Sequence, residues 1–237
     1  MTPADEQDQR RIVVAIDGPA GAGKSTVALE LAKRLGYTLV DTGALYRAVA
    51  LCARERGISW DDGPALGALT RDLQLEFGRS ADGAPRVRID GRDRGDDIRT
   101  PEISMGASDV SRHPEVRDAL LGLQRRLGQD GGVVLEGRDI GTVVFPNAEA
   151  KIFLTASAEI RADRRVQDLR ARGLEADPVK TLAEVQARDA QDSSRAVAPL
   201  KPAADSVVVD TTHMGFDEVV TRLVALVNGV SRAGGSG

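Results

Sequence analysis

The chain has 237 residues, of which 41% are hydrophobic and 29% charged, and a formal net charge of −4 at pH 7. This length suits one domain, with or without an insertion, and the apolar content is sufficient for a substantial core. The acidic balance argues against nucleic-acid binding and membrane-surface binding, and no apolar run approaches the ~20 residues of a membrane helix.

The first part of the chain alternates between strand and helix patterns. The β-branched run RIVVAIDG (11–18) ends in glycine and is typical of a buried parallel strand. After a loop, Val27, Leu31 and Leu35 recur at helical spacing, and Gly36 marks the end of that helix. A second strand over 37–43 and a second amphipathic helix over 43–57 complete a β-α-β-α order. This order predicts an α/β fold with a parallel sheet.

The next region, about 63–100, departs from this order. Alternating segments at 73–78 and 85–90, and a short arm after Asp90, are separated by turn-forming residues and predict a small antiparallel meander. The region is too short to bury a core of its own, so we interpret it as an insertion.

The remaining elements return to the α/β pattern. We expect helices over 101–111, 114–128, 157–172, 178–193 and 215–228, and strands over 132–137, 151–156 and 206–210. One domain would thus have a core over about 11–62, 101–156 and 200–230, with flexible tails at 1–10 and 231–237.

A few isolated residues bear on where the protein works. Cys52 alone cannot form an intramolecular disulfide or a multi-cysteine zinc site, and its apolar surroundings predict a buried side chain. His113 and His213 show no metal-ligand spacing. The opening stretch MTPADEQDQRR has no apolar segment, so we expect no secretory signal and a cytoplasmic protein.

The stretch GPAGAGKST (18–26) carries the strongest chemical signal. It fits G-x4-G-K-[ST] between a predicted strand and a predicted helix, as a phosphate-binding loop requires. Its glycines let successive N–H groups point at phosphate oxygens, and the helix start adds its positive dipole end. We expect Lys24 to reach the β- and γ-phosphates of a nucleoside triphosphate and Ser25 to offer its hydroxyl to Mg²⁺. The predicted binding residues are Gly18, Pro19, Ala20, Gly21, Ala22, Gly23, Lys24, Ser25 and Thr26.

Arginines follow several predicted strands. Arg47 comes after the second strand and Arg138 after the strand at 132–137, so both belong to the carboxyl edge of the sheet, where ligands of open α/β sheets bind. Arg188 and Arg195 are seven residues apart, two turns along one helix face. A single arginine of this kind is typical of a solvated surface, but several together favour a second phosphate-binding site.

Asp17 and Asp41 also end strands, and they could either orient metal-bound waters or cap loops.

Several motifs together resemble the bacterial cytidylate kinases. These are the phosphate loop, DTGALYR, DIRTPE, ASDVSRHPEVRDAL, EGRDIGTVVFPNAEAKIFL and RDAQDSSRAVAPLKPAADSVVVD, which cover about residues 12–228. The resemblance implies ATP- and Mg²⁺-dependent phosphorylation of CMP and dCMP by a monomer. It also implies a three-layer P-loop NTPase fold with a five-stranded parallel sheet, an antiparallel insertion in the nucleoside-monophosphate-binding region, and a helical lid over about 157–173. Thr42 stands where serine is common, and Glu136 where aspartate is as frequent; both keep the functional group.

The resemblance also implies roles for individual residues. The catalytic cations would be Lys24, Arg138, Arg188 and Arg195. The cytosine would be read by Ser108, Arg117 and Asp139, and the acceptor phosphate held by Arg47, Arg138, Arg188 and Arg195, in a pocket shaped by Thr42 and Tyr46. Asp192 would accept a sugar hydroxyl, and the lid would bring Arg161, Arg164 and Arg165 to ATP.

Other readings of the same residues stay open at this level. Asp139 could form a salt bridge with Arg138, and Ser108 and Arg117 could be surface polarity of a helix. A carboxylate and a guanidinium do complement the amine donor and ring acceptors of cytosine. Alternative functions are a P-loop kinase for shikimate or dephospho-coenzyme A, and a regulatory nucleotide-binding protein that hydrolyses slowly. The missing N-K-x-D motif argues against a switch GTPase.

Overall fold

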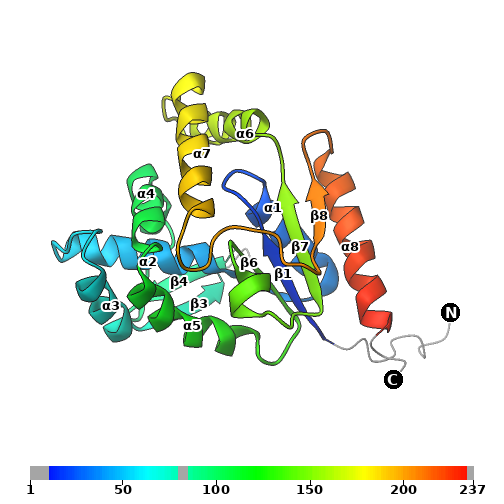
Figure 1. Ribbon diagram of the computed structural model, residues 1–237, viewed down its shortest axis with the longest axis horizontal. Helices are drawn as coiled ribbons and strands as arrows, with labels where there is room; N and C mark the ends of the chain where they lie inside the picture. The colour runs from blue at the N-terminus through cyan, green and yellow to red at the C-terminus, as the bar shows by residue number, and fades with distance from the viewer. Residues whose placement is uncertain (1–10, 80–84, 234–237) are drawn as a thin grey trace.

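The main sheet lies at the centre of the molecule (Figure 1). The computed structural model describes residues 11–79 and 85–233. Within them, the main sheet contains β1 (Val13–Asp17), β2 (Thr38–Asp41), β6 (Val133–Gly137), β7 (Ala150–Thr155) and β8 (Val207–Asp210), all parallel, in the order β2-β6-β1-β7-β8. The predicted five-stranded parallel sheet is confirmed.

Alternate residues of β1 face opposite layers of the fold. Val14 and Ile16 pack on one side with α1 (Lys24–Leu35) and α8 (Phe216–Ala233). Ala15 packs on the other side with Leu135 and Ile140, beside α5 (Pro114–Gly128). Successive side chains of a strand point to opposite faces, so this single strand contributes to both cores. The result is the predicted three-layer arrangement, with the sheet between two layers of helices (Figure 1).

A further core lies beside the main sheet. It joins α2 (Thr42–Glu55), α3 (Gly63–Asp72), α4 (Pro101–Val110) and α5 to a small sheet of β3 (Leu75–Arg79), β4 (Pro85–Ile89) and β5 (Arg92–Asp93). The small sheet is antiparallel throughout, as predicted for the meander. A short 3-10 turn at Asp97–Arg99 leads from it into α4. The Cys52 thiol is free and buried, and burial raises its pKa.

Helix α3 was not expected from the sequence. Two glycines and a proline in ten residues lower helix propensity, yet the Asp62 carboxylate caps the helix by accepting from the Ala65 N–H at 3.0 Å. Proline is tolerated here because it occupies the first turn. A Cβ on Gly67 would lie 2.5 Å from the Cβ of Glu115, so this glycine allows α3 and α5 to approach closely. Tertiary packing, rather than local propensity, therefore explains the helix.

The carboxyl-terminal part of the chain contains a helical hairpin and the last helix. Helices α6 (Ala158–Ala171) and α7 (Pro178–Ser193) lie against each other above the sheet edge (Figure 1). Helix α8 runs to Ala233, past the expected end at 228, so residues 231–233 are helical rather than part of a tail. The expected tail residues 1–10 and 234–237 lie outside the described residues. Among the described helices, none combines the length and apolar character needed to cross a bilayer.

Candidate active site

The phosphate loop joins β1 to α1, as predicted. Gly21 and Gly23 adopt positive φ angles of 76° and 86°, which favour glycine. Gly18 lies so close to β7 that a Cβ there would be 1.9 Å from the carbonyl oxygen of Leu154. The loop therefore requires glycine both for its backbone conformation and for its contact with the neighbouring strand.

Lys24 is buried at the start of α1. Its Nζ donates to the carbonyl oxygen of Pro19 at 2.7 Å, within the loop itself. Burial lowers the pKa of Lys24 well below its ordinary value, and the nearby Arg138 and Arg188 lower it further. Ser25, by contrast, is exposed at the mouth of the loop. The donor loop thus faces a region that is already rich in positive charge.

The arginines expected to hold the acceptor phosphate come together from separate elements. Burial lowers the pKa of Arg188 to about 10, and Arg138, Arg165 and Arg47 contribute to the same shift. The Nε atoms of Arg47, Arg188 and Arg195 are buried and have no hydrogen-bond partner within the described chain. Crowded like charges with unused donors are costly unless anions neutralise them. We call Arg47, Arg138, Arg188 and Arg195 the acceptor cluster.

Carboxylates already neutralise part of the acceptor cluster. Asp192 is 1% exposed and accepts from Arg138 Nε at 2.9 Å and from Arg195 Nη2. Burial opposes ionisation of Asp192, but Arg138, Arg195 and Arg188 outweigh it and hold its pKa below the ordinary value. Arg47 donates to Asp41 at 2.6 Å. Asp41 also caps α2 by accepting from the Ala44 N–H, so it holds both a helix end and an arginine.

The residues expected to read the base also lie together. Arg117 donates to the buried carboxylate of Asp139, and its guanidinium lies 5.6 Å from the ring centre of Tyr46. The alternative pairing of Asp139 with Arg138 is wrong, because Arg138 pairs with Asp192. The buried hydroxyl of Ser108 has no hydrogen-bond partner within the described residues.

Ser111 connects these groups to one another, and Thr42 ties together two elements beside them. Arg195 donates to the Ser111 hydroxyl at 3.0 Å, and that hydroxyl donates to the Ser108 carbonyl oxygen at 2.9 Å. Thr42 donates to the carbonyl oxygen of Glu136 at 2.7 Å, which ties the start of α2 to β6. The acceptor cluster and the base-reading group therefore form one continuous polar region.

The three arginines expected in the lid have different surroundings. Arg161 is buried, donates to the carbonyl oxygens of Ala156 and Ala20 at 2.9 and 3.1 Å, and donates to both carboxylate oxygens of Asp189 at 2.9 and 2.5 Å. Arg164 donates to the carbonyl oxygen of Thr211 at 2.9 Å. Arg165 lies near Arg188. Arg161 thus links the α6–α7 hairpin to the phosphate loop, a contact that its helical spacing does not reveal.

Comparison with known proteins decides the family. The family model described as cytidylate kinase matches residues 14–229. A cytidylate kinase from Syntrophotalea carbinolica is 52% identical over 218 residues, 92% of each chain, and one from Exiguobacterium sibiricum is 49% identical over 220 residues, 93% of this chain and 98% of its own. The chain belongs to the cytidylate kinase family. A solved shikimate kinase from Acinetobacter baumannii aligns with a TM-score of 0.46 and 15% identity over 93% of this chain and 95% of its own.

In this member of the cytidylate kinase family, sequence reasoning assigned no role to three residues beside the site. Glu136 is the last residue but one of β6, is 4% exposed, and interacts with Ser25, while its Oε1 has no partner within the described chain. Burial raises the pKa of Glu136 to about 7, and Asp41 adds to the shift. The sequence position of Glu136 could have identified it. A carboxylate near the end of β6, the strand beside β1, lies at the same sheet edge as the phosphate loop.

The other two such residues are Arg99 and Gln124. Arg99, in the quoted motif DIRTPE, lines a small hollow together with Asp41 and Arg47. Gln124 is buried on α5 and hydrogen-bonds the Tyr46 hydroxyl. Helical spacing indicates that Gln124 shares a face with Arg117, seven residues earlier, but it does not identify Tyr46 as the partner.

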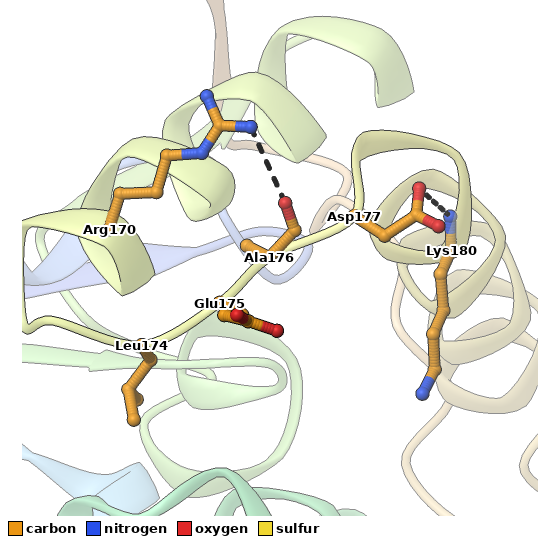
Figure 2. A pocket seen from close by; sticks show the side chains of 6 residues that line it. All are labelled: Arg170, Leu174, Glu175, Ala176, Asp177 and Lys180. Carbon is orange, nitrogen blue, oxygen red and sulfur yellow. Dashed lines mark hydrogen bonds between the residues drawn. The ribbon is translucent and has the colours of Figure 1, made fainter.

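A wider hollow of about 650 Å³ lies at the turn between α6 and α7. Figure 2 shows its lining, which is formed by Arg170, Leu174, Glu175, Ala176, Asp177 and Lys180. Arg170 donates to the Ala176 carbonyl oxygen at 3.4 Å, and the Lys180 backbone N–H donates to Asp177 at 3.3 Å. The lining carries both signs of charge and includes none of the predicted site residues. The residues expected at the active site lie elsewhere, at the phosphate loop and in the acceptor cluster.

Asp17, whose role was open, holds a turn of the main chain. Its two carboxylate oxygens accept from the N–H groups of Ile140 and Gly141 at 2.8 and 2.7 Å. Burial raises its pKa from 3.8 to about 6, although these two hydrogen bonds act in the opposite direction. Of the two roles considered, the observed contacts are those of a loop cap.

The raised pKa of Asp17 predicts how stability depends on pH. Because its folded pKa exceeds its unfolded value, its protonation stabilises the fold fully below 3.8, and this contribution is lost as pH rises through about 6. The shift corresponds to about 3 kcal/mol. We expect the stability of the native chain relative to Asp17→Asn to fall by about this amount between about pH 4 and about pH 7.5. Urea unfolding of both proteins across this range measures the change, and a constant difference would contradict the prediction.

Proposed function

We propose that this chain transfers the γ-phosphoryl group of ATP to CMP and dCMP, giving CDP and dCDP. The observation that carries the proposal is the acceptor cluster, which gathers at the carboxyl edge of the sheet close to Lys24. The similarity to cytidylate kinases from other bacteria supports the same activity. The phosphate loop would bind the triphosphate of the donor. The acceptor cluster, a second group of cations, would bind an acceptor that itself carries a phosphate.

Cytosine recognition falls to the residues beside the acceptor cluster. The Asp139 carboxylate can accept from the exocyclic amine of cytosine, and Arg117 and Ser108 can donate to its ring acceptors. Uracil carries a carbonyl in place of that amine and would place an acceptor oxygen against the buried carboxylate, which supports strong discrimination. Burial of Asp139 and Arg117 and the unpartnered Ser108 hydroxyl support this assignment.

Phosphoryl transfer here needs positioning and charge stabilisation more than proton chemistry. The phosphate of CMP is already anionic, so no strong general base is required. Arg138 and Arg195 would exchange Asp192 for the acceptor phosphate, while Arg188 offers its unused Nε and Asp192 becomes free to accept a sugar hydroxyl. Lys24 would release the Pro19 carbonyl and donate to the transferred group, whose charge these cations stabilise.

The residues at the loop also fit a magnesium ion. Ser25 provides a hydroxyl, and Glu136 beside it provides a buried carboxylate with an unpartnered oxygen. Hard oxygen ligands and bridging waters are what Mg²⁺ prefers. When bound, the ion would neutralise charge on the triphosphate. Ser25 and Glu136 would hold it directly or through water.

The α6–α7 hairpin fits the role of the helical lid over the donor. Arg161 of α6 contacts both the phosphate loop and Asp189 of α7, so the hairpin is tied to the loop. Arg165 lies near Arg188 of the acceptor cluster. A lid that closes here would exclude water, which otherwise competes with CMP as the phosphoryl acceptor. The lid segment of about 157–173 thus belongs to the proposal.

A coupled assay of ADP release with a panel of acceptors tests the proposed function. We expect kcat/KM for CMP to exceed that for UMP, AMP and shikimate by at least about 100-fold, because a mispaired buried carboxylate disfavours the wrong base. Equal or greater turnover with shikimate or dephospho-coenzyme A would identify a different metabolite kinase. ATP turnover that no acceptor stimulates would indicate the regulatory nucleotide-binding protein instead.

A further inference from the structure

We propose that Asp17 is a positioning residue that fixes Arg138 and Asp139 relative to the phosphate loop, by accepting hydrogen bonds from the main chain that follows them. The inference rests on the proposed function, in which Arg138 holds the acceptor phosphate and Asp139 reads the base. Asp17 itself touches neither nucleotide in this proposal. Its effect is transmitted through the main chain at residues 140–141.

The contacts of Asp17 span two parallel neighbours in the sheet. Asp17 is the last residue of β1 and lies in register with Gly137, the last residue of β6. From there its side chain, 5% exposed, engages the N–H groups of both Ile140 and Gly141 at 2.8 and 2.7 Å. Both carboxylate oxygens are therefore used on one short segment, which restrains its rotation as well as its distance from β1.

The restrained segment begins immediately after the two functional side chains. Asp139 precedes the short π-helical turn Ile140–Val144, and its carbonyl oxygen accepts from the N–H groups of Val143 and Val144 at 2.9 and 3.2 Å. The turn and the Asp139 main chain thus move as one unit. Holding the first two amides of the turn therefore sets the direction in which Arg138 and Asp139 leave the sheet.

A second anchor holds the far end of the same segment. Lys151 of β7 donates to the carbonyl oxygen of Pro146 and to Asp205 at 2.7 Å. This contact lies beyond the turn and involves no functional residue. Asp17 is the anchor at the end that carries Arg138 and Asp139, so its loss affects the site more directly than loss of the Lys151 contacts.

The position of Asp17 in the chain gives it influence over both substrates. Its backbone leads directly into Gly18, the first residue of the phosphate loop, while its side chain holds the acceptor side of the site. A single residue therefore sets the separation between the donor grip and the acceptor grip. In-line transfer requires reacting atoms about 3–3.5 Å apart, and a displacement of about 1 Å can cost about 10²-fold in rate.

Two graded variants of the full chain test the inference. Asp17→Asn keeps one acceptor oxygen, and Asp17→Ala keeps none, so kcat with CMP should fall by about 10-fold and about 100-fold respectively. The ratio of kcat/KM for CMP over UMP should fall in the same order, because Asp139 loses its orientation. Val227→Ala, on the buried face of α8, is the control; it should lower thermal stability and leave that ratio unchanged.

The outcomes separate the inference from the function on which it rests. If the native chain shows no preference for CMP, the proposed function fails before the variants are considered. If the native chain prefers CMP and both folded variants keep its kcat and its CMP/UMP ratio, Asp17 is only a structural cap and the inference is overturned. Circular dichroism checks folding, and if Asp17→Ala does not fold, Asp17→Asn with its retained oxygen decides alone.

Discussion

Lys24→Met is expected to lower kcat by about 10³-fold with every acceptor, since it removes a cation aimed at the charge of the transferred group. Methionine keeps much of the apolar stem, so the buried space at the start of α1 stays filled. The Pro19 carbonyl oxygen loses its donor, a cost limited to the loop. The effect should fall on kcat for CMP, dCMP and UMP alike, because Lys24 serves the donor side. The coupled assay of ADP release measures it.

The matched control for Lys24→Met is Lys33→Met, an exposed position on the same helix. It should leave kcat and KM unchanged. Calorimetric titration with CMP should give the same affinity for the Lys24 variant as for the native chain, because the acceptor site is intact. A Lys24→Met protein that keeps most of its activity would remove the phosphate loop from the mechanism.

Asp139→Asn is expected to lower the CMP/UMP ratio of kcat/KM by about 100-fold. An amide can turn its NH₂ toward the carbonyl of uracil, whereas the carboxylate suits only the amine of cytosine. The change therefore lowers turnover of CMP and raises that of UMP. Steady-state kinetics with both nucleotides measure the ratio directly, and an unaltered ratio would show that Asp139 does not read the base.

Stability must be followed in the same experiment, because Asp139 neutralises the buried Arg117. Removing one partner of a buried ion pair costs about 3–5 kcal/mol. Kinetics should therefore be recorded well below the melting temperature of the variant. Asp168→Asn, at an exposed carboxylate on α6, is the control and should change neither the melting temperature nor the nucleotide preference.

The fold could be predicted largely from periodic patterns. The strands of the main sheet are short apolar runs, and four of the five end at glycine or aspartate; both signals are local. Helix α3 could not be predicted, because Gly63 and Gly67 serve contacts with α5 rather than helix formation. The extension of α8 to Ala233 was also missed, since small and polar residues near a chain end resemble a tail.

The site could be predicted as a set of residues, but not as a set of contacts. Strand ends and the quoted motifs indicated which arginines meet, and the structure brings those of the acceptor cluster together. The partners of these groups lie far away in sequence: Arg161 finds Asp189, and Asp17 finds Gly141. No spacing rule connects residues that only the strand order of the sheet or the packing of α6 on α7 brings side by side.

The internal ion pairs of the acceptor cluster affect both the folding of the nucleotide-free enzyme and the release of its product. Arg47 pairs with Asp41, and Arg138 and Arg195 share Asp192, so three of the four arginines have a carboxylate partner supplied by the chain itself. The polypeptide can therefore fold before it meets any nucleotide. An incoming phosphate must displace these carboxylates from the arginines. The same ion pairs can form again when the nucleoside diphosphate dissociates. This exchange of partners lowers the affinity for the substrate phosphate and also speeds dissociation of the product, which allows the enzyme to turn over.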